Sequence, residues 1–134
     1  MLLLGLVREI AVRTEDGVLN GKDQRAVEIT PSLFEGGDTR DFLSAAIHSG
    51  ESIASGHYRA VICYGGEDLL ANDASNISII SNQFAGSSSR LASVLLYRAT
   101  LVKETLALQR KDLEDSGIQN LVNFNRVSGQ LFLN

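Results

Sequence analysis

The 134-residue chain has little of what marks secreted, membrane-spanning or nucleic-acid-binding proteins. Its single cysteine, Cys63, allows no internal disulfide, so a reducing compartment is expected. The net charge of −4 argues against a nucleic-acid-binding surface, which needs a basic patch. The apolar run Leu2–Val7 is too short for a membrane span and lacks the basic start of a signal peptide, so we interpret it as a buried strand. We therefore expect an intracellular protein, in the cytoplasm or nucleus, with neither nucleic-acid nor membrane partners.

Up to about Phe84 the chain reads as short strands separated by close turns. The expected strands cover residues 2–13, 24–30, 42–47, 58–64, 68–73 and 77–80. Turn chemistry is found at Thr14-Glu15-Asp16-Gly17, at Asn20-Gly21 and at Gly65-Gly66. Close turns between short strands predict a largely antiparallel sheet.

A different pattern begins after Gly86, where three serines can cap a helix. From Ser89 to Asp115 there is no glycine or proline, and the apolar residues fall on one wide stripe. The sequence therefore predicts a long helix over residues 89–115 that ends near Gly117, and then a short strand or a loosely docked end over 118–134. The expected class is α+β, with a β domain at 1–84 and a helical extension and tail at 85–134.

The hairpin around Gly65-Gly66 is the most informative segment for function. A two-residue turn places Tyr64 opposite Glu67, and continued pairing places His57 and Asn72 on one face as diagonal neighbours, roughly 7–8 Å apart. Asp73 would point to the other face unless a bulge shifts the alternation. An asparagine beside a histidine can fix the direction of the ring, and the histidine can then take a proton from a thiol. The geometry thus suggests the orienting half of a Cys-His-Asn site.

No nucleophile accompanies this pair. Cys63 lies six residues from His57 on the same expected strand, roughly 20 Å away at about 3.3 Å per residue, so we interpret it as a small buried residue. The serines that could approach the histidine are Ser49, Ser52 and Ser55. None of them lies in a G-x-S-x-G nucleophile elbow.

No metal or cofactor is expected. The residues that a metal site would need are His48, His57, Cys63 and Asp73. Their spacing matches no standard zinc pattern. A purely structural histidine at the start of a strand remains the alternative to a catalytic one.

The stretch also resembles the histidine box of the ubiquitin-specific proteases, in the carboxyl-terminal half of their catalytic domain. That box reads H-x-G, a short loop, G-H-Y, an apolar strand and then an acidic or amide pair. The matching segments are His48-Ser49-Gly50, Ser55-Gly56-His57-Tyr58, Arg59-Ala60-Val61-Ile62 and Asn72-Asp73. Upstream, similar segments occur in the family's order at Leu2–Arg8, Ile29–Leu33 and Phe42–Ile47, with Lys22 where a lysine often follows the turn. The resemblance covers about residues 2–80.

The resemblance implies the palm-like sheet of a papain-like cysteine protease. It assigns His57 as general base, Asn72 as the residue that orients it, and Asp73 as a substitute or helper. It also implies a surface for the tail of ubiquitin or a ubiquitin-like protein. The substrate-binding residues would be His48, Ser49, Gly50, Ser55, Gly56 and Tyr58.

The chain also departs from the family. The cysteine box, the thumb and the zinc-ribbon fingers have no counterpart in these residues, and Asp68 and Ala71 stand where aromatic residues are usual. One hypothesis is a partial or degenerate deubiquitinating thiol protease that is inactive alone and needs a second chain to supply a cysteine-bearing thumb. The alternatives are a non-catalytic binder of a ubiquitin-like modifier, and a module that forms homo-oligomers through its helix.

Overall fold

The computed structural model describes residues 1–73, 76–80 and 83–115. Its strands are β1 (Leu2–Gly5), β2 (Glu9–Thr14), β3 (Gly17–Lys22), β4 (Val27–Glu28), β5 (Ser32–Glu35), β6 (Asp38–Ser49), β7 (His57–Tyr64), β8 (Glu67–Asn72), β9 (Asn76–Ile79), β10 (Ser88–Ser89) and β11 (Ala92–Ala99), and they precede the helix α1 (Lys103–Asp115). All the strand pairs are antiparallel, so the expected α+β class is confirmed at this level. Within the described part of the chain, no helix is long and apolar enough to cross a membrane.

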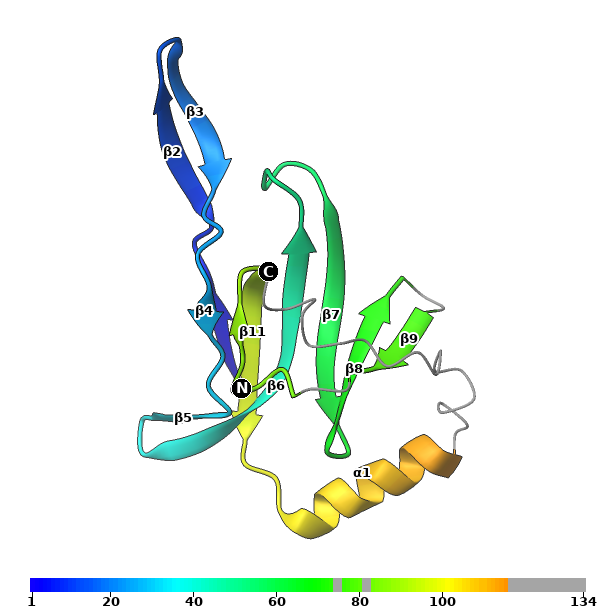
Figure 1. Ribbon diagram of the computed structural model, residues 1–134. Helices are drawn as coiled ribbons and strands as arrows, with labels where there is room; N and C mark the ends of the chain where they lie inside the picture. The colour runs from blue at the N-terminus through cyan, green and yellow to red at the C-terminus, as the bar shows by residue number, and fades with distance from the viewer. Residues whose placement is uncertain (74–75, 81–82, 116–134) are drawn as a thin grey trace.

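The main sheet is built around the long strand β6. Its strand order is β1-β11-β6-β7-β8-β9, and β5 pairs with the first four residues of β6 (Figure 1). The strands β2 and β3 form a separate hairpin that projects beyond this sheet (Figure 1). A short ribbon of β4 and β10 completes the fold.

The hydrophobic core lies on one face of β6. Phe42, Ala45 and Ile47 are all buried there, although their spacing does not follow a strict alternation. A register shift between β6 and β11 leaves Leu43 as an extra residue on β6, and this brings Phe42 to the same face as Ala45 and Ile47. The ring of Phe42 packs at 5.5 Å from that of Phe84 and at 5.9 Å from that of Tyr97. Tyr97 is 1% exposed, and its hydroxyl donates to the Thr30 carbonyl oxygen at 2.8 Å.

The helix predicted over residues 89–115 is wrong in its first half. Residues 92–99 form β11, which lies between β1 and β6, and the helix begins only at Lys103. Leu95 and Tyr97 are buried on alternate positions, and both neighbouring strands satisfy the backbone of β11. Periodicity alone cannot separate a short apolar strand from a buried helix. The main sheet therefore extends past the division expected at residue 84.

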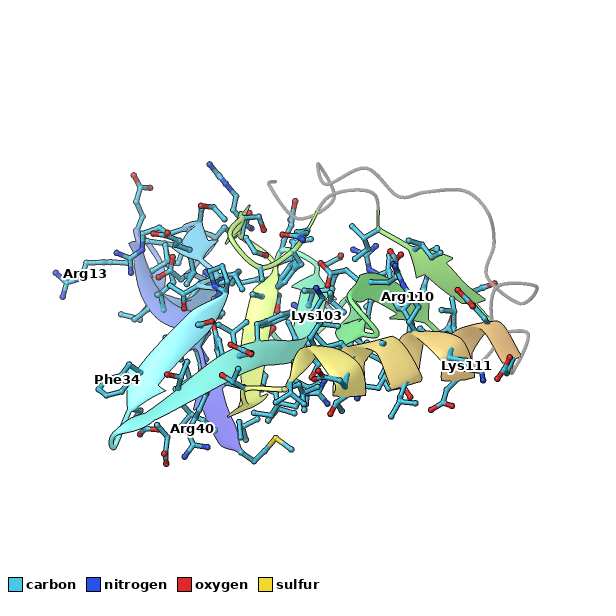
Figure 2. The ribbon with its side chains drawn as sticks, turned by 90° about the horizontal axis from the view of Figure 1, so that it is seen from below. Arg13, Phe34, Arg40, Lys103, Arg110 and Lys111 are labelled. Atoms are coloured by element: carbon cyan, nitrogen blue, oxygen red, sulfur yellow. The ribbon has the colours of Figure 1, made fainter. Side chains whose placement is uncertain are left out.

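The helix α1 docks on the turn between β7 and β8. The amide of Gly65 donates to the Gln109 side chain at 3.4 Å, and Arg110, which Figure 2 labels, pairs with Glu67. A methyl group on Gly65 would lie 2.9 Å from the Arg110 backbone, so this contact needs a glycine. The predicted stop at Gly117 and the tail at 118–134 lie outside the described residues.

Two of the three expected turns occur. Glu15-Asp16 turns β2 into β3, and Gly65-Gly66 turns β7 into β8. The turn expected at Asn20-Gly21 is wrong, because both residues continue β3. Gly21 lies opposite Ile10, and a methyl on it would lie 2.7 Å from a methyl of Val12. Gly21 therefore leaves space for the Val12 side chain and does not form a turn.

Candidate functional site

The centre of the candidate site is a hydrogen bond between two adjacent strands. His57 opens β7 and Asn72 closes β8, so both lie at the same end of the sheet (Figure 1). The register expected from Gly65-Gly66 is confirmed from Tyr64 opposite Glu67 onwards. The Nε2 atom of His57 lies 2.5 Å from Oδ1 of Asn72, so the expected contact is confirmed.

This hydrogen bond determines which ring nitrogen of His57 carries the proton. Oδ1 of Asn72 only accepts, so Nε2 must donate. In the neutral ring, Nδ1 is then left with a lone pair and can accept a proton. Asn72 therefore selects one tautomer and holds the ring in one direction.

Asp73 plays a different part from Asn72. It is exposed in the turn that follows β8, and its φ of 60° ends the extended backbone there. The hydrogen bond to the His57 ring comes from Asn72.

The loop between β6 and β7 brings the other expected binding residues to this end of the sheet. His48 is 2% exposed, and its ring lies 4.5 Å from the ring of Tyr58, which is opposite it in the ladder and 59% exposed. Ser49 is opposite His57. Gly56 is so close to β6 that a methyl on it would lie 2.2 Å from the Ser49 carbonyl oxygen. The loop is thus closed tightly at its neck, directly before His57.

Two of the three serines considered as nucleophiles already have hydrogen-bond partners. Arg59 donates to the Ser49 hydroxyl at 3.0 Å, and the Ser52 hydroxyl accepts from the Ala54 amide at 3.0 Å. Ser55 is exposed in the loop, and its carbonyl oxygen faces Gly50. In the described part of this loop, no hydrogen bond joins a serine hydroxyl to His57.

Cys63 is in an environment that opposes thiolate formation. It is half-buried beside the core and is opposite Asp68 in the ladder. Burial, followed by the charge of Asp68 and a hydrogen bond to it, raises the pKa of Cys63 to about 11. Burial also raises the pKa of Asp68, whose carboxylate accepts from the Phe84 amide at 2.7 Å. Cys63 therefore belongs to the packing of the sheet.

We expect Cys63 to react slowly with thiol reagents in the folded chain. Raising the pKa of the thiol from its ordinary 9.0 to about 11 lowers the thiolate fraction at pH 8 by about 100-fold, and the higher intrinsic nucleophilicity recovers about tenfold. The net rate should be about tenfold or more below that of the chain in denaturant, and it should rise with pH towards about 11. Absorbance of a disulfide reagent measures this directly, because the chain has one cysteine. Equal rates for the folded and denatured chain would contradict this account.

Two buried cations were not given a role by the sequence. Arg8 is 7% exposed, and Lys22 is 8% exposed. Both line a cleft of about 290 Å³ together with His48, Ile53 and Tyr58. Burial lowers the pKa of both, and the Arg8 charge lowers that of Lys22 further. A buried cation close to a turn carries no sequence signature, although Lys22 falls where the resemblance expects a lysine.

The described residues contain no group of three or more His, Cys, Asp and Glu side chains that could hold a metal ion. The four residues considered for zinc are dispersed. His57 is hydrogen-bonded to Asn72, His48 packs on Tyr58, Cys63 pairs with Asp68, and Asp73 lies in a turn.

Two comparisons with known proteins found no relative of this chain. No protein-family model matches the chain, and no curated protein is significantly similar to it.

Proposed function

We propose that this chain supplies the His/Asn half of a deubiquitinating thiol protease site and that its sheet corresponds to the palm of a papain-like protease. The observation that carries the proposal is the hydrogen bond from His57 Nε2 to Asn72 Oδ1. It joins the two residues to which the resemblance gives the roles of base and orienting residue. The exposed ring of His57 can be approached from solvent or by another polypeptide.

The proposed thiol chemistry uses Nδ1 of His57, the ring nitrogen that Asn72 leaves free to accept a proton. A thiol placed beside Nδ1 of His57 would give its proton to the ring, and the thiolate would attack the isopeptide carbonyl carbon. The imidazolium would then return the proton to the departing lysine amine, and water would release the acyl group from sulfur. Asn72 would keep the ring in place through both transfers, because its oxygen accepts from Nε2 in the neutral and the charged form.

A purely structural role explains this arrangement less well. A hydrogen bond between exposed groups contributes little to stability, because water replaces it at small cost. The structural alternative also gives no reason for the tightly closed loop that leads into His57 or for the exposed ring of Tyr58 beside it.

A non-catalytic binder of a ubiquitin-like tail is the second candidate. It is favoured by the state of Cys63, whose thiol is half-buried, has a raised pKa and lies far along β7 from His57. The oligomerising module is less favoured, since half of the helix expected to form its surface is the strand β11.

The test is a pair of experiments with ubiquitin. We expect no covalent product between the isolated chain and ubiquitin that carries a C-terminal electrophile, because no activated thiol is present. We expect titration with unmodified ubiquitin to shift the backbone NMR signals of residues 48–58, and ubiquitin without its terminal Gly-Gly to leave them in place. Covalent labelling would contradict the missing nucleophile, and unshifted signals at high ubiquitin concentration would contradict tail binding.

A further inference from the structure

Lys22 is a buried lysine that binds backbone carbonyl groups. Its Nζ donates to the His48 carbonyl oxygen at 2.8 Å and to the Gly50 carbonyl oxygen at 3.0 Å. Among the described residues, no carboxylate forms an ion pair with it. Burying an ammonium group is costly, so stability alone does not explain why Lys22 is buried against these two carbonyl groups.

The two carbonyl groups lie at the neck of the loop that leads into His57. They flank Ser49, which forms with His57 the last pair of the ladder between β6 and β7. A methyl on Gly50 would lie 2.7 Å from the Ser55 carbonyl oxygen, so the two sides of the neck are nearly in contact. The methyl would also lie 3.1 Å from Cα of Gly56, the residue directly before His57, so Lys22 holds the side of the neck that packs against the start of β7.

Arg8 attaches the end of β3, which carries Lys22, to the main sheet. The guanidinium of Arg8 donates to the Asp23 and Arg25 carbonyl oxygens at 3.2 and 2.6 Å, directly after Lys22. It also donates to the Ala92 carbonyl oxygen at 2.9 Å. The end of β3 is thus fixed relative to the start of β11, and Lys22 reaches the loop neck from there.

From these contacts we infer that Lys22 is a positioning residue, which holds the neck of the 50–56 loop so that His57 meets Asn72. The role as a positioning residue for catalysis rests on the proposed function. The geometric claim, that Lys22 sets the orientation of the His57 ring, does not.

The variant Lys22→Met tests the inference, because it keeps most of the length of the unbranched side chain and removes its donors. Two-dimensional NMR of the imidazole nitrogens, at a pH where the ring is neutral, reports which nitrogen carries the proton. We expect the wild-type chain to show one tautomer, with the proton on Nε2. Lys22→Met should show an averaged pattern, as should Asn72→Ala, which removes the acceptor. Amide exchange at residues 50–57 should become about tenfold faster in Lys22→Met.

The matched control is Lys103→Met, which removes an exposed lysine at the start of α1 (Figure 2) and should change neither readout. If Lys22→Met does not fold, Lys22→Gln, which retains an amide donor, replaces it and should give a smaller change in the same direction. An unchanged tautomer pattern in a folded variant would overturn the inference. So would faster exchange spread evenly over the sheet. Neither readout uses ubiquitin, so a failed ubiquitin titration leaves this result intact.

Discussion

Gly56→Ala should lower the free energy of unfolding by about 3 kcal/mol and displace the loop that carries His57. The backbone at Gly56 has a φ of 129°, which side-chain-bearing residues rarely adopt. The added methyl would lie 2.2 Å from the Ser49 carbonyl oxygen and 2.7 Å from Nε2 of His48. Because the first of these contacts joins the new methyl to backbone, no side-chain rotation relieves it. Denaturant unfolding measures the loss, and the NMR signals of residues 48–58 should shift most.

Gly66→Ala is the control for backbone strain alone. Its φ of 81° is also left-handed, but nothing lies within 4 Å of the added methyl. We expect a loss of about 1–2 kcal/mol, with the signals of the 50–56 loop unchanged. If both variants lost the same stability, the close approach at the loop neck would not constrain the fold.

Arg8→Met should lower the free energy of unfolding by about 3 kcal/mol. The guanidinium of Arg8 donates to four backbone carbonyl oxygens, which belong to Asp23, Arg25, Ser89 and Ala92. Buried carbonyl groups that lose their donor cost about 1–3 kcal/mol each, and partial hydration of the cleft reduces their sum. The methionine would also leave the base of the β2–β3 hairpin without its attachment to β11.

Arg13→Met provides the matched comparison. Arg13 is exposed on β2 of the projecting hairpin and points away from it (Figure 2), so its loss should change stability by less than about 0.5 kcal/mol. Urea denaturation followed by circular dichroism gives both values. Amide exchange should also become faster at residues 50–57 in Arg8→Met, because the end of β3 that carries Lys22 is then no longer attached to β11. Similar stabilities of the two variants would mean that Arg8 does not tie the hairpin to the sheet.

The proposed function would depend on a partner. The oriented ring of His57 is exposed, and the thiol of Cys63 is held in its protonated form by its surroundings. A chain of this kind would cleave only when another polypeptide places a cysteine beside Nδ1, and would otherwise bind without cleaving. The ubiquitin experiments separate these two situations from a purely structural histidine.

The sequence by itself determined the turns at Glu15-Asp16 and Gly65-Gly66 and, through the second of them, the pairing of His57 with Asn72. A Gly-Gly turn fixes the register of the two strands that it joins, and side chains alternate along each strand. The position of Asn72 beside His57 therefore follows from counting outwards from the turn, and the hydrogen bond of 2.5 Å agrees with that count.

Only the tertiary structure decided the identity of residues 92–99 and the roles of the two buried cations. Leu91 and Leu95 fit a helical stripe, whereas Leu95 and Tyr97 are buried with the alternation of a strand, and the contact of β11 with both β1 and β6 selects the strand. Arg8 and Lys22 bind carbonyl groups far along the chain, where no local pattern records the contact. Local turn chemistry thus placed His57 beside Asn72, and long-range packing fixed the loop that leads into His57.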